Sequence, residues 1–105
     1  MQESYREKRV TERISANEEV NISYRNMFYS GTVLNLSEKG MFIGTKKYFP
    51  PDSMCVITFR EKNDFMKLFA KVKQRTSLNT FYNGIGVELL GPPQTYLQFI
   101  DTLRP

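Results

Sequence analysis

The stretch EEVNISYRNMFYSGTVLNL, residues 18–36, carries the strongest signal for the fold. Val20, Ile22 and Tyr24 alternate with polar residues, which is the period of a half-buried β-strand. Asn26 is a turn-forming residue, and residues 28–36 are rich in the β-branched and aromatic side chains that favour strands. The stretch therefore predicts two antiparallel strands joined by a turn near Asn26.

The chain continues with more strand-like segments. In residues 65–74 the apolar side chains fall on one face of a strand and the lysines on the other. A helical interpretation of that segment is possible, but the alternation is cleaner. Pro50 and Pro51 predict a loop, because proline cannot donate a hydrogen bond to a sheet. After the hairpin the predicted strands are residues 40–45, 54–59, 65–74 and 85–90.

The last part of the sequence has a helical period instead. Pro92 and Pro93 can open a helix, and Tyr96, Leu97, Ile100 and Leu103 then fall on one face. Short antiparallel strands separated by turns, followed by one amphipathic helix, predict an all-β fold. We expect a small closed or nearly closed antiparallel β-barrel with a C-terminal α-helix packed on it.

Composition argues against an enzyme and against a metal protein. The 105 residues contain no histidine, which is the commonest general base and metal ligand. They contain only one cysteine, too few for a structural zinc site. Cys55 stands among apolar residues, so we expect it in the core. No phosphate-binding glycine loop occurs. No segment has the length or hydropathy of a membrane span or a secretory signal. These observations favour a cytoplasmic binding module without a cofactor.

Basic residues crowd the start of the chain. The formal net charge is +4, and Arg6, Lys8, Arg9 and Arg13 all lie within the first thirteen positions. Residues 1–12 contain a single strong aliphatic residue, too little apolar surface to offset the entropy of ordering them. We therefore expect a flexible basic segment at 1–13 and a barrel with its helix at 14–105.

The hairpin predicts where these arginines emerge. If Tyr24 faces Phe28 and Ile22 faces Ser30, the same register puts Asn17 opposite Asn35. Arg13 lies four residues before Asn17, and Ser37 lies two residues after Asn35. The basic segment and the turn NLSEKG, residues 35–40, are thus expected at the same end of the hairpin.

These side chains suit a ligand with phosphates and a base edge. Arginine offers a planar donor fork that matches phosphate, and guanine N7 and O6 are its commonest bidentate base target. Asn35 can donate and accept, and Ser37 adds a hydroxyl. Gly40 permits either a positive φ or a close backbone approach, and turn N–H groups can form an anion-binding concavity.

RxxxR at Arg9–Arg13 followed by NxSxxG at Asn35–Gly40 resembles the two-part signature of PilZ domains. GIGVELL at 84–90 is similar to a late strand of that family. The resemblance implies a six-stranded barrel that binds cyclic di-GMP. It further implies that Arg9 and Arg13 hold the phosphates and guanines, Asn35 bonds a guanine edge, Ser37 contacts the ligand and Gly40 shapes the turn. Lys8 stands where the family often has arginine, and so implies a weaker contact.

Two other functions compete with a cyclic di-GMP receptor that signals to a so far unidentified downstream protein. One is a protein-interaction adaptor without nucleotide binding, which the intact motif argues against. The other is a basic barrel for single-stranded nucleic acid, which is disfavoured because basic and aromatic positions are scattered along the sequence. For Tyr82 we favour strand packing over base stacking. The lysines at 67, 71 and 73 are interpreted as the outer face of a strand.

Overall fold

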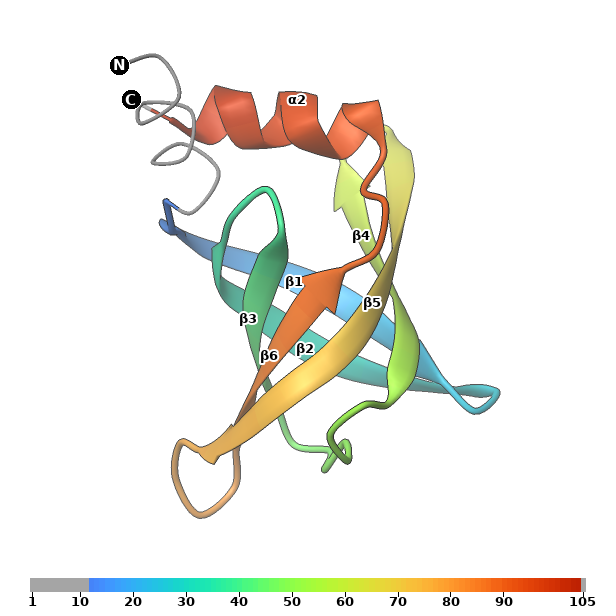
Figure 1. The fold of residues 1–105 in the computed structure, drawn as a ribbon, viewed down its shortest axis with the longest axis vertical. Helices are drawn as coiled ribbons and strands as arrows, with labels where there is room; N and C mark the ends of the chain where they lie inside the picture. The colour runs from blue at the N-terminus through green and yellow to red at the C-terminus, as the bar shows by residue number, and fades with distance from the viewer. Residues whose placement is uncertain (1–11, 105) are drawn as a thin grey trace.

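The computed structural model describes residues 12–104, which form six strands and one helix (Figure 1). Every paired strand is antiparallel, and the order around the sheet is β1-β2-β3-β6-β5-β4 with β4 returning to β1. The predicted six-stranded barrel with a C-terminal helix is therefore confirmed. The elements are β1 (Ile14–Tyr24), β2 (Met27–Leu36), β3 (Gly40–Thr45), β4 (Met54–Glu61), β5 (Asp64–Ser77), β6 (Asn83–Leu89) and α2 (Gln94–Leu103).

Alternation along the strands fills the barrel. In β5 the apolar positions Met66, Leu68, Ala70 and Val72 are buried while Lys67 between them is exposed, so the strand interpretation of this segment is correct. Burial excludes water from the thiol of Cys55 and raises its pKa to about 11. That thiol is a core group, as expected, and is poorly suited to act as a nucleophile.

The β1–β2 hairpin differs by one residue from the expected register. Tyr24 pairs with Met27 and Ile22 with Tyr29, because the turn has two residues rather than three. Both turn residues, Arg25 and Asn26, have positive φ, at 50° and 63°. Two positive φ values are typical of the tight hairpin turn whose twist matches the strands.

A bulge near the start of β1 changes the register once more. The pairing shifts between Ser15 and Glu18, so Ser15 rather than Asn17 lies opposite Asn35. Ile14 then pairs with Leu36, directly before the β2–β3 turn. The expected consequence holds despite the shifts, because the start of β1 and the NLSEKG turn lie at the same end of the hairpin.

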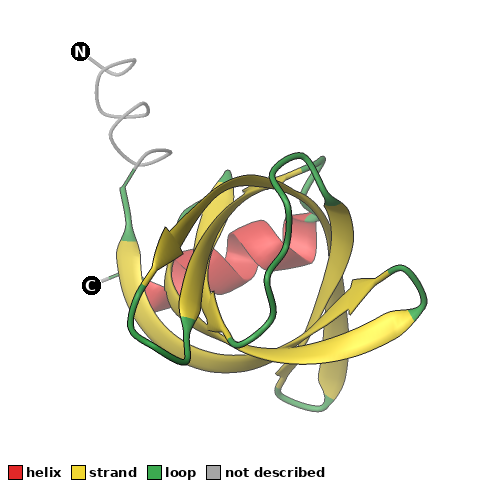
Figure 2. Ribbon diagram, turned by 90° about the horizontal axis from the view of Figure 1, so that it is seen from below, coloured by secondary structure: helices red, strands yellow, loops and turns green. Residues whose placement is uncertain are grey.

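Two different elements close the barrel ends. Helix α2 lies across one end, seen through the barrel in Figure 2, and buries Tyr96 and Ile100 against the core. At the other end the β3–β4 loop inserts Phe49, whose ring makes edge contacts with Tyr24 and Tyr29 at centroid distances of 5.4 and 5.5 Å. Within residues 12–104, no helix has the length and hydropathy that a bilayer crossing needs.

Candidate functional site

Arg13, from the first half of the motif, meets the second half at the end of the barrel that α2 covers. Arg13 precedes β1, and its Nη1 donates a hydrogen bond to Asn35 Oδ1 at 3.4 Å. The bulge in β1 makes this contact possible by aligning Ser15 with Asn35. Arg13 is exposed and Asn35 half-buried, so the guanidinium keeps donors for a second partner. Lys8 and Arg9 lie outside the described residues, and their assigned roles stay predictions.

The β2–β3 turn is closed by its own backbone. The Ser37 N–H donates to the Gly40 carbonyl at 2.8 Å, and the Lys39 N–H donates to Ser37 Oγ at 3.4 Å. Ser37 is only 4% exposed. The hydroxyl therefore serves the turn first, and it reaches a ligand only through the cavity that it lines.

Gly40 has a packing role rather than a conformational one. Of the two expected possibilities the structure shows the close backbone approach and not the positive φ, because Gly91 is the only glycine of the described chain with a positive φ. An added Cβ at Gly40 would instead lie 2.6 Å from the Val87 carbonyl oxygen and 3.8 Å from Arg13 Nη2. The missing side chain allows β3 to pack tightly on β6 and leaves room for the arginine beside it.

A cavity of about 340 Å³ adjoins this turn. It brings Arg13, Ser37 and Gly40 together with residues of β5 and β6, while Asn35 borders it only through its contact with Arg13. Sequence reasoning did not assign four polar residues of the lining to this site: Lys39, Lys73, Gln74 and Glu88.

Three of these residues, Lys73, Gln74 and Glu88, could not be placed here from the sequence alone. Gln74 reaches the cavity because a register shift between Val72 and Gln74 sets it opposite Gly86, and no residue type in the segment announces that shift. Lys73 pairs with Glu88 at 3.9 Å, so the cavity holds positive charge that is only partly compensated. For Lys39 the sequence did offer a signal, because this basic residue lies inside the NLSEKG motif.

Helix α2 is tied to the same turn by a buried hydrogen bond. The Tyr96 hydroxyl donates to the Ser37 carbonyl oxygen at 2.6 Å. Burial raises the pKa of Tyr96 above its usual range, while the nearby positive charge of Arg13 lowers it and the carboxylate of Glu38 raises it. The phenol is thus neutral and donates throughout the physiological range.

Arg104, just after α2, joins the helix to both sides of the site. Its guanidinium lies 3.4 Å from Glu12, next to Arg13, and 3.3 Å from Glu38 in the turn. It also pairs with Asp101 at 2.7 Å. The Arg104 side chain is only 11% exposed, so solvent screens these ion pairs less than it screens a fully solvated pair. Arg104 thus links the end of α2 to the residue before Arg13 and to the turn.

The geometry places charged, amide and hydroxyl groups around a cavity whose lining also includes apolar surface. No group of three or more potential ligands among residues 12–104 could hold a metal ion. The arrangement suits recognition of an anionic ligand with hydrogen-bonding edges.

Comparison with known proteins identifies the family to which the chain is similar. The family model for the PilZ domain matches residues 7–103. No curated protein matched. Among solved structures, the Bacillus subtilis inhibitor of motility MotI/DgrA superposes with a TM-score of 0.68 at 16% identity, over 86% of this chain and 48% of that protein. The chain thus spans about half of that structure.

A second solved structure has the same fold. The PilZ domain of CeSA, from a cellulose-synthesizing bacterium, superposes with a TM-score of 0.63 at 17% identity, over 89% of this chain and 95% of that domain. Because the family model covers nearly the whole sequence, the chain belongs to the PilZ domain family of cyclic di-GMP receptors, whose domains are binding and adaptor modules rather than enzymes.

Proposed function

We propose that this protein is a bacterial cyclic di-GMP receptor that acts in the cytoplasm and signals to a downstream protein. The observation that carries the proposal is the contact between Arg13 and Asn35 beside the cavity. It joins the two motifs that are far apart in sequence. Arg13, Asn35, Ser37 and Gly40 would form the ligand site, and the segment that holds Lys8 and Arg9 would complete it.

The chemistry of each residue supports this ligand. The Arg13 fork can grip a phosphate or the N7 and O6 of guanine. The Asn35 amide, now an acceptor for Arg13, can also donate to a guanine edge. Lys39 and Lys73 add positive charge around the cavity, which favours a dianionic ligand over a neutral one.

The contacts of α2 support a route for the signal. A ligand that engages Arg13 and the turn competes with the Arg13–Asn35 hydrogen bond and acts on the carbonyl held by Tyr96. Glu12 and Glu38 share Arg104, so the same event changes the anchoring of the helix. We include in the proposal that residues 6–13 become ordered over the turn when ligand binds, which creates a new surface for the partner.

Calorimetric titration with cyclic di-GMP tests the function. We expect wild-type protein to bind and Arg13→Ala to lose on the order of 2–4 kcal/mol of binding free energy, because hydrogen bonds to charged groups are the strong ones. Arg60→Ala is the matched control, since Arg60 is exposed on β4 and contacts Phe65 rather than the motif. Equal affinities for both variants, with equal melting temperatures, would refute the site. No binding by wild type would favour the adaptor without nucleotide.

A further inference from the structure

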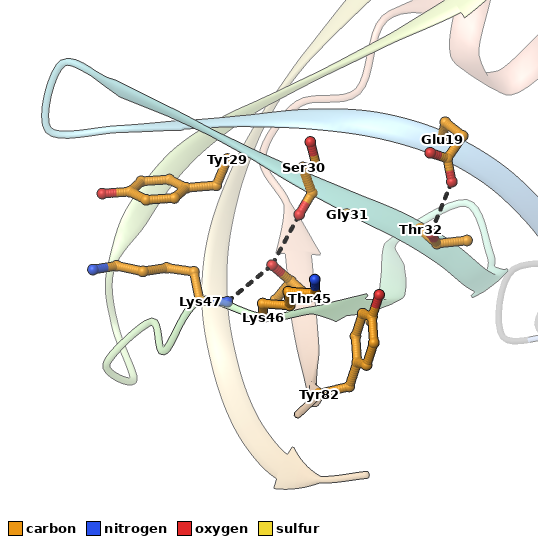
Figure 3. Close-up of a pocket in the computed structure, with 10 residues that line it drawn as sticks. Glu19, Tyr29, Ser30, Gly31, Thr32, Thr45, Lys46, Lys47 and Tyr82 are labelled. Atoms are coloured by element: carbon orange, nitrogen blue, oxygen red, sulfur yellow. Dashed lines mark hydrogen bonds between the residues drawn. The ribbon is translucent and has the colours of Figure 1, made fainter. Parts of the chain in front are cut away.

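A second cavity, of about 400 Å³, lies at the opposite end of β3 from the motif (Figure 3). Gly40 begins β3 and Thr45 ends it, which separates the two places by roughly 17 Å at the rise of an extended strand. The lining comes from β1, β2, β3 and the loops that follow β3 and β5. None of the motif residues belongs to it.

The lining combines two lysines with two tyrosine rings. Lys47 Nζ lies 5.1 Å from the centroid of the Tyr29 ring, and Lys46 Nζ lies 5.8 Å from that of Tyr82. In Figure 3 Tyr29 and Lys47 stand on one side of the cavity and Tyr82 on the other. Tyr82 precedes β6 and is 42% exposed, so its interpretation as strand packing is wrong. The partly exposed ring can offer an aromatic surface to a planar ligand.

Within residues 12–104, no ion pair neutralises the positive charge at this cavity. Lys71, Lys73 and Arg104 each have a carboxylate partner, but no ion pair within the described part of the chain involves Lys46 or Lys47. The one acid in the lining is Glu19, which accepts a hydrogen bond from the Thr32 hydroxyl at 2.9 Å. The ammonium groups therefore remain available for an anion.

The Thr45 hydroxyl, which lines the cavity, already has hydrogen-bond partners within the protein. The buried Thr45 hydroxyl donates to the Ser30 carbonyl at 3.0 Å and accepts the Lys47 N–H at 3.3 Å. These bonds fix the backbone that carries both lysines. A third pair beyond the cavity, Arg75 over the Tyr48 ring at 4.5 Å, continues the same pattern. The fold has gathered basic and aromatic residues that are scattered in the sequence.

We propose that this cavity is a second nucleotide site, which takes a nucleoside monophosphate unit either as a free nucleotide or within a single strand of RNA. The lysines supply the positive charge that binds the phosphate, and the base stacks on the exposed ring of Tyr82. An acidic peptide would use the two charges but not the ring faces, so the tyrosines favour a nucleotide. The site goes beyond the proposed receptor function and stands independently of it.

The test uses two probes, guanosine monophosphate in calorimetry and a labelled uridine oligonucleotide in fluorescence anisotropy. Both are measured at low salt with cyclic di-GMP saturating, so that the motif site is filled. Binding of the mononucleotide identifies a free-nucleotide site, and binding of the oligonucleotide alone identifies a strand site. Failure of wild type to bind either probe overturns the proposal, as does equally strong displacement of the probe by polyglutamate.

Matched variants locate the binding. We expect Lys46→Glu and Tyr82→Ala each to weaken it by about tenfold or more, since charge and stacking carry such sites. The controls Lys67→Glu, with the same change in net charge, and Phe81→Ala, a neighbouring ring that is 75% exposed and not part of the lining, should stay within about twofold. If a control variant lost as much probe affinity as its matched variant, the assignment of the site would be overturned.

Arg13→Ala distinguishes this proposal from the receptor function. It should reduce binding of cyclic di-GMP and leave probe binding unchanged. A loss of cyclic di-GMP binding in Lys46→Glu that matches the loss in Arg13→Ala would make the two cavities one site, and would overturn the proposal of a second one.

Discussion

At the scale of single residues, Gly40 shows how a motif position acts through packing. An alanine Cβ would come within 2.6 Å of the Val87 carbonyl oxygen, a backbone atom that moves only if β3 and β6 separate. We therefore expect Gly40→Ala to destabilise the fold by about 1–3 kcal/mol, as overpacking does, and Gly40→Val to be worse. Urea unfolding measures the difference.

Gly44 on the same strand is the control for this prediction. A Cβ there would meet Leu34 Cδ1 at 3.5 Å, an ordinary contact, so Gly44→Ala should change stability by less than about 0.5 kcal/mol. If Gly40→Ala were as stable as Gly44→Ala, the close approach to Val87 would have no energetic role.

Only some residues of the site could be predicted from the sequence, and the limit has a physical reason. Arg13 and Asn35 could be chosen because their side chains can hydrogen-bond an anionic ligand, and Gly40 because glycine allows a close backbone approach. No feature of the sequence singles out Gln74, because it reaches the cavity through a register shift in β5. The reason for Gly40 was also beyond the sequence, because its constraint comes from Val87, 47 positions along the chain.

At the scale of elements, the β1–β2 hairpin shows why boundaries were harder than types. The alternation of Val20 and Ile22 identified a strand, and both are buried. A two-residue turn with positive φ usually contains glycine, but here it is made of Arg25 and Asn26. With no glycine to mark it, the turn was expected one residue too long, which shifted the whole register.

Helix α2 gives a prediction at this scale through Tyr96. Tyr96→Phe removes the hydroxyl that satisfies the buried Ser37 carbonyl, which should cost about 1–3 kcal/mol of stability. The variant should also bind cyclic di-GMP less tightly, because the turn loses its support. Chemical unfolding and calorimetry measure the two effects. Tyr48→Phe, an exposed ring on the β3–β4 loop, should change neither.

The pH dependence offers a separate check on Tyr96. Its pKa is raised in the folded state, so the unfolded chain releases this proton first, above the ordinary tyrosine value of about 10. Stability contributed by the neutral phenol is therefore complete below that pH and is lost as pH rises further. The stability difference between wild type and Tyr96→Phe should shrink in alkaline solution. A difference that is constant with pH would show that Tyr96 does not carry the effect.

At the scale of the whole molecule, the barrel was predictable in kind but its strand order was not. Period-two segments followed by one helical segment limited the fold to a small barrel with a helix. The neighbours β3 and β6 are separated in the chain by two other strands, and no local pattern specifies such a pairing. The apolar Phe49 inside a proline-containing loop was a missed signal, since it is fully buried and closes the barrel end.

Arg104 also acts at this scale, because it connects Glu12, at the start of the described chain, and the end of α2 with the NLSEKG turn. Glu12 and Glu38 share its guanidinium, so cyclic di-GMP should change amide hydrogen exchange in three places together. We expect protection to rise in residues 6–13, at the turn and in α2. In Arg104→Gln the first two should still respond while α2 responds less, since the helix has lost its ionic anchor. Protection of residues 6–13 that is already high without ligand, and unchanged at saturation, would leave Arg13 as a preformed clamp and exclude ordering as the signal.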